Sequence, residues 1–322
     1  MRVRSEPATR TSGSIQCRCF TRRGLCALGA LQTGGTHVLP PAYDPDYMLR
    51  LFEEERGPIA ICVPTMLFRI LDGASITSRD LSSWRMVTLG GAPVAPDLAR
   101  RAQQLGLKVA IGYGQTEASP YLTHTLPDDP HPDWTSTVGR PLPRTEIKIV
   151  NPETGTIVAR GEIGEICARR YSIMKDYFDN SEATLSTIDS EGWLHTGDLG
   201  SLDEYGYRRV QGRVKDMIIR GGENIYPREI EDILHAHPAI LDASIVGITD
   251  REWGEVPVAF VQIKAGQQTT AEELTQFCRE QLASYKIPRV WHFVEQFPQT
   301  ASGKTQKFAL REMYLRQQAT PH

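Results

Sequence analysis

The sequence predicts an α/β protein in which a mostly parallel sheet is followed by antiparallel strands and then by a small α+β domain. Residues 85–111 have the pattern strand, helix, strand with short loops, which is typical of a parallel βα unit. Residues 137–170 change to short alternating strands separated by turn residues. From residue 213 onward helices and strands alternate again, and Thr270 opens a capping-box sequence.

The composition is that of a globular protein with room for one large or two ordinary domains in 322 residues. The net charge of −3 gives no field suited to nucleic acid or an anionic membrane, so neither partner is expected. No apolar run approaches the roughly 20 residues of a spanning helix. Six scattered cysteines predict reduced thiols in the cytoplasm, without a structural metal at Cys17 and Cys19. Nothing in the sequence specifies an oligomeric state.

The first elements are short and their order predicts where a ligand binds. We expect helices over 45–56, 66–71 and 95–105, and strands over 59–63, 85–89 and 108–111. In parallel sheets of this type, ligands bind outside the carboxyl ends of the strands. The loops that follow residues 89 and 111 are therefore the first candidate binding loops.

These two loops carry groups suited to a nucleotide. The first loop, residues 90–93, reads Gly-Gly-Ala-Pro and offers backbone at close approach to an adenine edge. In the second loop Tyr113 offers an aromatic face for stacking, and Thr116 offers a hydroxyl for a phosphate. Glu117 offers a hard oxygen for Mg²⁺. Either loop alone is ordinary loop chemistry, but both at strand ends in this order favour a nucleotide site.

A carboxylate and a guanidinium form a second candidate pair. Asp198 follows a Thr-Gly turn, and Arg213 stands beside another glycine. A carboxylate accepts paired hydrogen bonds from the two hydroxyls of a ribose, and a nearby guanidinium can bind the same sugar or its phosphate. Lys215 follows, and a short strand then leads into Gly221, Gly222 and Glu223.

Beyond these glycines the sequence predicts a compact α+β unit. Pro227 suits the first position of a helix because it has no N–H to leave unsatisfied. Strands are expected over 243–248 and 256–263, and a helix from Thr270 to about residue 282.

In order and spacing, these features resemble the motifs of the adenylate-forming (AMP-binding) superfamily. They are YGQTE at 113–117, the acid at 198, Arg-x-Lys at 213–215 and GGENIYP at 221–227. SGKTQK at 302–307 resembles the terminal lysine motif in its acyl-CoA synthetase form. The resemblance covers about residues 25–310. It implies the later part of a large adenylating domain over 25–212, a parallel α/β layer plus an antiparallel barrel-like subdomain, followed by a small mobile C-terminal domain over 213–322.

The resemblance implies an AMP-forming fatty acid–CoA ligase that uses ATP, Mg²⁺ and coenzyme A, with a medium-chain fatty acid as the expected substrate. Its implied catalytic residues are Lys304, Thr116 and Glu117, the last also holding Mg²⁺. Its implied nucleotide-binding residues are Gly91, Ala92, Pro93, Tyr113, Gly114, Gln115, Asp198 and Arg213. Lys215 is the implied hinge, and Gly221, Gly222 and Glu223 are the implied coenzyme A loop.

The chain departs from this family in one respect. It contains no Ser/Thr/Gly-rich stretch ending in lysine, which in the family cradles the β- and γ-phosphates. We therefore expect an N-terminally truncated synthetase that is inactive or impaired alone. The alternative is a noncatalytic fragment that binds AMP, coenzyme A or a partner protein. Turnover of preformed acyl adenylate would favour the first, and tight AMP binding without turnover the second.

Residues 1–24 differ from the rest of the chain, with six arginines against one acid. Three interpretations stay open. The segment has the composition of a transit peptide, which would direct the protein to mitochondria, or of a disordered basic arm. The third is translation out of frame, since residues 16–21 can be encoded so that a shifted frame reads Met-Pro-Met-Phe-His, similar to a motif of the acyl-CoA synthetases.

Overall fold

The computed structural model describes residues 13–16, 34–38, 40, 43–300 and 305–319. The chain divides into two compact units, which are described separately. Unit 1 holds the residues up to Thr196 together with Gly200–Val210, and unit 2 holds Gly197–Leu199 and the residues from Gln211 onward. All residues after Val210 belong to unit 2. The sequence predicted a domain boundary between residues 212 and 213, close to this position, and that boundary stays a prediction.

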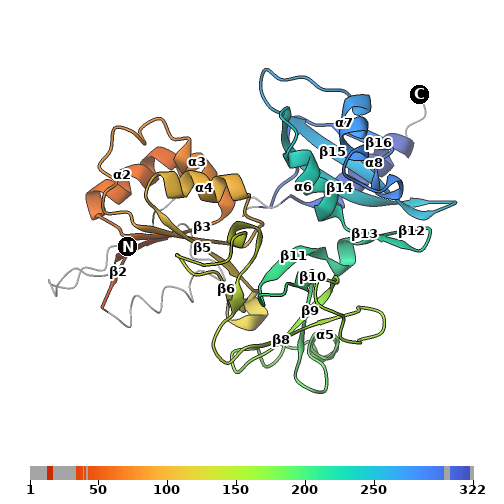
Figure 1. The fold of residues 1–322 in the computed structure, drawn as a ribbon, viewed down its shortest axis with the longest axis horizontal. Coiled ribbons are helices and arrows are strands. Elements are labelled where there is room, and N and C mark those ends of the chain that lie inside the picture. Colours follow the sequence, from red (N-terminus) through yellow and green to blue (C-terminus); the bar gives the residue numbers. More distant parts are fainter. Residues whose placement is uncertain (1–12, 17–33, 39, 41–42, 301–304, 320–322) are drawn as a thin grey trace. The chain divides into compact units, whose positions relative to one another are not determined.

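A seven-stranded sheet forms the first layer of unit 1 (Figure 1). Its order is β2-β1-β3-β4-β5-β6-β7. The strands are β1 Gly13–Gln16, β2 Thr36–Val38, β3 Ile59–Cys62, β4 Met86–Gly90, β5 Lys108–Tyr113, β6 Thr123–His124 and β7 Arg140–Pro141. Strands β1 to β5 pair in parallel, whereas β6 and β7 join antiparallel. The expectation of a mostly parallel α/β layer is thus confirmed.

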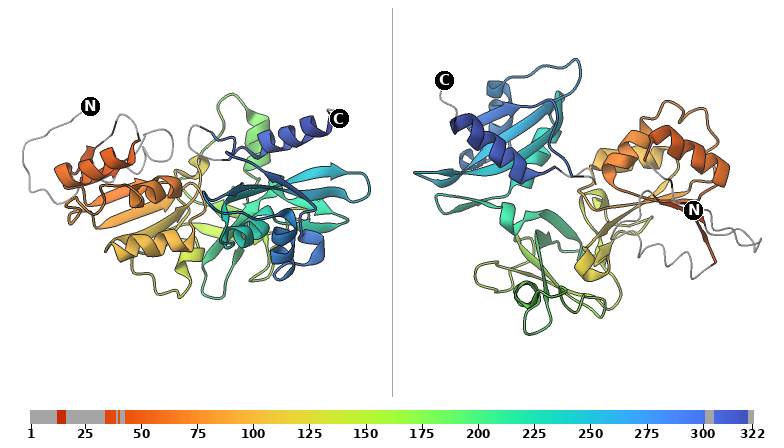
Figure 2. Two further views of the ribbon diagram at one scale, coloured as in Figure 1. Left: turned by 90° about the horizontal axis from the view of Figure 1, so that it is seen from above. Right: turned by 180° about the vertical axis from the view of Figure 1, so that it is seen from behind.

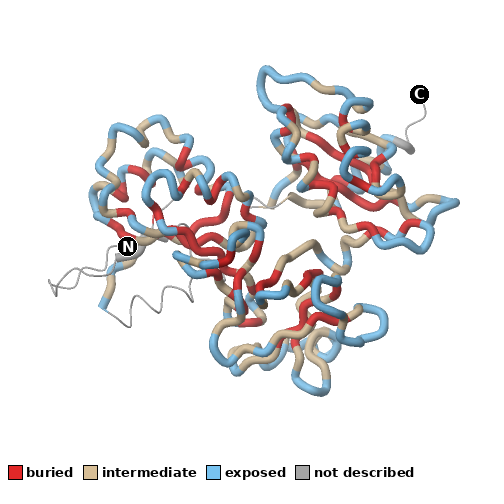
Figure 3. Tube along the Cα trace, viewed as in Figure 1, coloured by how far each residue is buried: buried red, intermediate tan, exposed pale blue. Residues whose placement is uncertain are grey.

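Three helices cover one face of this sheet: α2 Pro45–Glu55, α3 Pro64–Leu71 and α4 Pro96–Gln104. Each has a proline in its first turn, and the Asp44 side chain caps α2 by accepting from the Tyr47 N–H. One apolar cluster joins the three helices to alternate residues of β3, β4 and β5, among them Val87 and Val109. The buried strands stand out in Figure 3. Because successive side chains of a strand point to opposite faces of the sheet, these alternate residues all lie on the face that packs against the helices.

A four-stranded sheet of order β11-β10-β9-β8 follows. Its strands are β8 Glu146–Val150, β9 Gly164–Arg169, β10 Leu194–Leu202 and β11 Arg208–Arg213, and helix α5 Ser181–Thr187 lies between β9 and β10 in the chain. In the part of the chain that the structure describes, this sheet ends at β8 and β11 and does not close. The expected antiparallel subdomain is confirmed, as an open sheet and not as a closed barrel.

Unit 2 is a small sheet with helices on both faces (Figure 2). The sheet order is β13-β12-β15-β14, and β16 pairs with β15. The elements are β12 Ile218–Arg220, β13 Glu223–Ile225, α6 Pro227–His235, β14 Ile240–Asp250, β15 Gly254–Ile263, α7 Ala271–Arg279, β16 Val290–Phe293 and α8 Lys307–Ala319. The expected small α+β unit is confirmed.

Alternate residues of β14 and β15 explain the layers of unit 2. Ile245 and Val261 face the cluster that holds α6 and α7, whereas Val246 and Phe260 face the cluster that holds Leu310 of α8. The expected capping box is present, because Thr270 and Glu273 each accept from the other's backbone N–H.

The Arg-rich segment 1–24 contributes one described element. Residues Gly13–Gln16 form β1, in parallel register with β2 and β3. The other residues of the segment lie outside the described residues, and the three interpretations of the segment stay predictions. Among the described helices, none has the length and apolar character needed to cross a membrane.

Candidate active site

The two predicted loops of unit 1 leave neighbouring strands at the same edge of the sheet. Gly90 at the end of β4 pairs in register with Gly112 near the end of β5. Gly91 has a φ of +84°, which turns the chain sharply away from β4. Tyr113 is partly buried against the cluster that contains Leu122. Residues 91–93 and 113–117 thus meet at the carboxyl edge, as predicted from the sequence.

Gly114 has a packing role that the sequence did not suggest. A Cβ atom at this position would lie 2.3 Å from the Pro120 carbonyl oxygen and 2.8 Å from the Leu122 backbone nitrogen. The same Leu122 N–H donates to the Tyr113 carbonyl at 2.8 Å. The absent side chain therefore makes room for the loop's own backbone, which folds back on itself after β5.

Glu117 is held by a residue sixty positions away. The Tyr177 hydroxyl donates to Oε1 of Glu117 at 2.9 Å, and the Met174 N–H donates to the Glu117 carbonyl at 2.7 Å. Burial, with the neighbouring Glu117 carboxylate, raises the pKa of Tyr177, so this hydroxyl keeps its proton as a donor. A carboxylate beside the exposed Thr116 hydroxyl fits Mg²⁺, which takes one or two carboxylates and fills its shell with waters and phosphate oxygens.

In unit 2, Asp198 and Arg213 come together as the sequence suggested. The Arg213 Nε lies 3.3 Å from Oδ1 of Asp198. The aspartate side chain is only 13% exposed, whereas the arginine side chain is 53% exposed. The carboxylate is therefore fixed at the strand while the guanidinium remains accessible to a sugar or phosphate.

The implied hinge and glycine loop follow directly. Lys215 is exposed in a 3₁₀ turn, Val214–Asp216, between β11 and β12. Gly221 and Gly222 form the two-residue turn of the β12–β13 hairpin, with φ of +59° and +88°.

The two glycines of this turn differ in their surroundings. A Cβ on Gly221 would lie 2.9 Å from the Trp253 ring, whereas a Cβ on Gly222 would meet nothing within 4 Å. Room for a ligand thus exists beside Gly222 but not beside Gly221. Glu223 is exposed at the start of β13.

Lys304 lies outside the described residues. Three positions later, the Lys307 ammonium lies 2.7 Å from Oε1 of Glu231 and 3.1 Å from the Ile245 carbonyl. Glu231 also accepts from the Ile245 N–H at 2.9 Å. The first turn of α8 is therefore tied to α6 and β14 by a partly buried ion pair.

Sequence reasoning missed Tyr177 and the Lys307–Glu231 pair as supports of the site. Each joins positions at least sixty residues apart, and no local spacing reports such a contact.

Comparison with known proteins agrees with this geometry. The family model "AMP-binding enzyme" matches residues 18–178, and the model "AMP-binding enzyme C-terminal domain" matches residues 229–304. The first match begins inside the Arg-rich segment.

Among curated relatives, YngI of Bacillus subtilis, named as an acyl-CoA synthetase, is 43% identical over 292 residues, which cover 89% of this chain and 53% of that protein. The zebrafish (Danio rerio) mitochondrial medium-chain acyl-CoA ligase ACSF2 is 42% identical over 298 residues, covering 91% of this chain and 49% of the ligase. The chain thus spans about half the length of these relatives.

A solved structure, o-succinylbenzoate CoA synthetase (MenE) of Bacillus subtilis with its acyl-adenylate intermediate, matches with a TM-score of 0.80 and 33% identity, covering 92% of this chain and 60% of that one. Sequence models and fold agree on the same assignment. The chain belongs to the family of AMP-binding enzymes.

Proposed function

We propose that the chain functions as an AMP-forming acyl-CoA synthetase. Such an enzyme activates a carboxylic acid as its adenylate and then transfers the acyl group to coenzyme A. The observation that carries this proposal is the Asp198–Arg213 pair, in which a nearly buried carboxylate and an accessible guanidinium stand 3.3 Å apart. Such a pair suits a ribose and its phosphate. The names of YngI and ACSF2 support coenzyme A as the acyl acceptor.

In the proposed reaction the carboxylate of the acid attacks the α-phosphorus of ATP, and pyrophosphate leaves. The thiolate of coenzyme A then attacks the acyl carbonyl, and AMP leaves. Asp198 would hold the ribose, and Tyr113 would stack on adenine. Lys304 and Thr116 would stabilise charge on the phosphoryl oxygens, and a fixed group of this kind is typically worth about 3 kcal/mol of barrier. Mg²⁺ held by Glu117 would neutralise phosphate charge.

The finer proposal concerns the acyl chain and the location. The medium-chain ligase ACSF2 supports a medium-chain fatty acid as substrate. ACSF2 is also mitochondrial by name, which fits the transit-peptide interpretation of residues 1–24, whereas the reduced cysteines favour the cytoplasm. A fluorescent fusion at the carboxyl end, with and without residues 1–24, separates the two locations.

The proposal predicts that the chain converts preformed octanoyl adenylate and coenzyme A to octanoyl-CoA and AMP, because this step needs no phosphate loop. Product formation is measured by chromatography, with acetyl adenylate as the control for chain length. We expect octanoyl adenylate to react at least tenfold faster.

The second candidate is a noncatalytic nucleotide-binding module. The lack of a Ser/Thr/Gly-rich stretch ending in lysine favours it. Saturable AMP binding without turnover of any acyl adenylate would decide for this candidate, and the synthetase proposal would then be wrong.

The proposed hinge gives a further prediction, that Lys215→Pro slows the coenzyme A step about tenfold and leaves AMP affinity unchanged. Proline fixes φ at Lys215 and restricts Val214, so a rotation at this turn is blocked. The measurements are octanoyl adenylate turnover and AMP calorimetry, with Gln268→Pro, in the exposed loop before α7, as the control. A normal coenzyme A step in Lys215→Pro would remove the hinge from the mechanism.

A further inference from the structure

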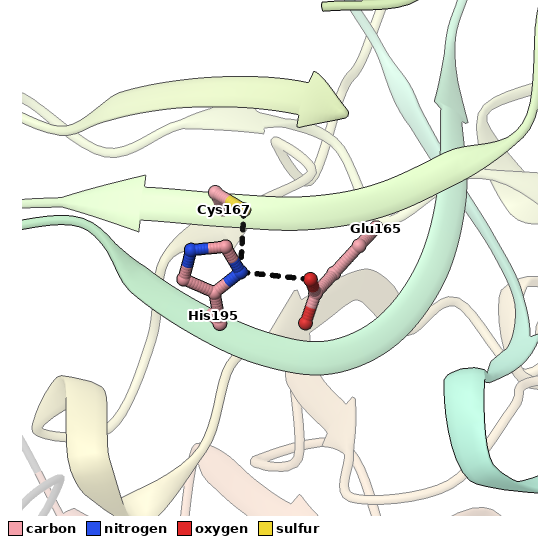
Figure 4. A group of neighbouring side chains, drawn as sticks. All are labelled: Glu165, Cys167 and His195. Atoms are coloured by element: carbon pink, nitrogen blue, oxygen red, sulfur yellow. Dashed lines mark hydrogen bonds and ion pairs between the residues drawn. The ribbon is translucent and has the colours of Figure 1, made fainter. Parts of the chain in front are cut away.

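Three side chains with metal-binding atoms, none of them a proposed active-site residue, converge on one face of the four-stranded sheet (Figure 4). Glu165 and Cys167 stand two residues apart on β9 and so point to the same face. His195 comes from the neighbouring strand β10. One carboxylate oxygen, the sulfur and one ring nitrogen all lie within 4.8 Å of one another.

Two ligand–ligand separations are close to those of a tetrahedral zinc site. The Cys167 sulfur lies 3.5 Å from Nδ1 of His195, and Oε2 of Glu165 lies 2.8 Å from the same nitrogen. With zinc bonds of about 2.0–2.3 Å, tetrahedral geometry places sulfur and nitrogen about 3.5 Å apart and nitrogen and oxygen about 3.3 Å apart. The Cys–His pair already matches, and Glu165 has to withdraw by about half an ångström, which its rotatable side chain permits.

A second carboxylate lies behind the histidine. Oδ2 of Asp189 is 3.7 Å from Nε2 of His195, on the side of the ring away from Glu165. Histidines that bind metals usually direct their other nitrogen at a carboxylate, which fixes the tautomer and leaves the ligating nitrogen free of a proton. Asp189 lies just beyond hydrogen-bond distance of Nε2, and an approach of about half an ångström would let it accept the Nε2 proton, with Nδ1 facing the sulfur.

The charges around the cluster favour a divalent cation. Two carboxylates, Glu165 and Asp189, face it. The neighbouring cations are Lys148, directly opposite Cys167 on β8, and Arg169, two residues along β9, whose guanidinium already pairs with Glu146. The Lys148 ammonium lies over the Trp193 ring, 4.4 Å from its centroid. Cys167 is fully buried, whereas 32% of the His195 side chain is exposed, so a cation can enter from the histidine side.

Neither an ion pair nor a reactive thiol accounts for all three side chains of the cluster. A simple Glu165–His195 ion pair leaves the sulfur without a role. A nucleophilic cysteine does not fit, because the Cys167 side chain is fully buried. A metal ion would displace the thiol proton to solvent and use all three atoms.

We propose that Glu165, Cys167 and His195 bind one thiophilic divalent cation such as Zn²⁺, with water as the fourth ligand. The mixture of nitrogen, sulfur and oxygen donors suits zinc and excludes Mg²⁺, which requires oxygen ligands. The site is therefore chemically distinct from the proposed magnesium position at Glu117. Bound zinc would link β9 to β10.

The test is a zinc titration of the full chain, read by competition with a chromophoric chelator. The substitutions Cys17→Ser, Cys19→Ser and Cys26→Ser are made first, because those cysteines lie outside the described residues and could bind zinc themselves. In this background we expect one Zn²⁺ per chain. Cys167→Ser and His195→Gln should each weaken binding at least tenfold, whereas Cys278→Ser, at another buried cysteine, should not change it.

Cobalt supplies an independent signal for the sulfur ligand. Co²⁺ bound to the parent chain should show a near-ultraviolet thiolate charge-transfer band that is absent in Cys167→Ser. Thermal unfolding of each variant in metal-free buffer first shows that it folds. If Cys167→Ser does not fold, the His195→Gln variant decides the test, because the His195 side chain is partly exposed. The proposal is overturned if no stoichiometric zinc binds, or if zinc binds equally to the His195→Gln and Cys278→Ser variants.

Discussion

Replacing Asp198 with alanine is expected to weaken AMP binding about 100-fold. The carboxylate of Asp198 is the proposed acceptor of two ribose hydrogen bonds, and each bond to a charged acceptor is worth about 1.5–3 kcal/mol. The folded state should tolerate the change, because the Arg213 guanidinium that loses its partner is half exposed and can be hydrated. Isothermal titration calorimetry of the full chain with AMP measures the loss.

Two further variants make this result specific. Asp198→Asn keeps the shape and one acceptor oxygen, so its AMP affinity should fall between those of Asp198→Ala and the parent. Asp242→Asn removes an exposed carboxylate that pairs with His235 at 2.9 Å and should leave AMP affinity unchanged. If Asp198→Ala bound AMP as the parent does, the nucleotide would have to be held elsewhere.

The second large effect is expected for Gly114→Ala, which should lower the stability of unit 1 by about 3 kcal/mol or more. The new methyl group would lie 2.3 Å from the Pro120 carbonyl oxygen, so the loop must open and the hydrogen bond from Leu122 to Tyr113 is lost. For a unit of this size the melting temperature should fall by about 6–12 °C. Thermal unfolding is followed by circular dichroism without any ligand.

Gly155→Ala is the matched control for this prediction. Gly155 has a left-handed φ of +68°, whereas Gly114 has a φ of +157°, and a Cβ on Gly155 would meet nothing within 4 Å. Its alanine variant should therefore lose only about 1–2 kcal/mol from backbone strain. Equal melting temperatures for the two variants would mean that the Gly114 loop relaxes freely, and that this glycine serves only the approach of a ligand.

Local patterns in the sequence determined most of the architecture. The elements from α2 to β5 follow from apolar periodicity and from prolines that suit helix starts, and their boundaries differ from expectation by only one or two residues. The capping box of α7 follows from Thr270 and Glu273 in the same way. The meeting of the two loops at one sheet edge also follows, because parallel strands bring their carboxyl ends together.

The open four-stranded sheet was not determined locally. Alternating strands at residues 137–170 predicted antiparallel pairing, which is a property of neighbouring segments. Whether such a sheet closes depends on the number of strands and on their stagger, which no single segment encodes. The sequence therefore predicted the antiparallel strands, but not that their sheet stays open.

The sequence by itself determined the elements, their order and the residue types of the candidate site, because these depend on periods and spacings within some thirty residues. Only the tertiary structure decided which distant side chains meet. It paired Tyr177 with Glu117, gave Gly114 its packing role, and brought His195 to Glu165 and Cys167. Such contacts arise from strand register and loop folding, which depend on interactions summed over a whole sheet and leave no local signature.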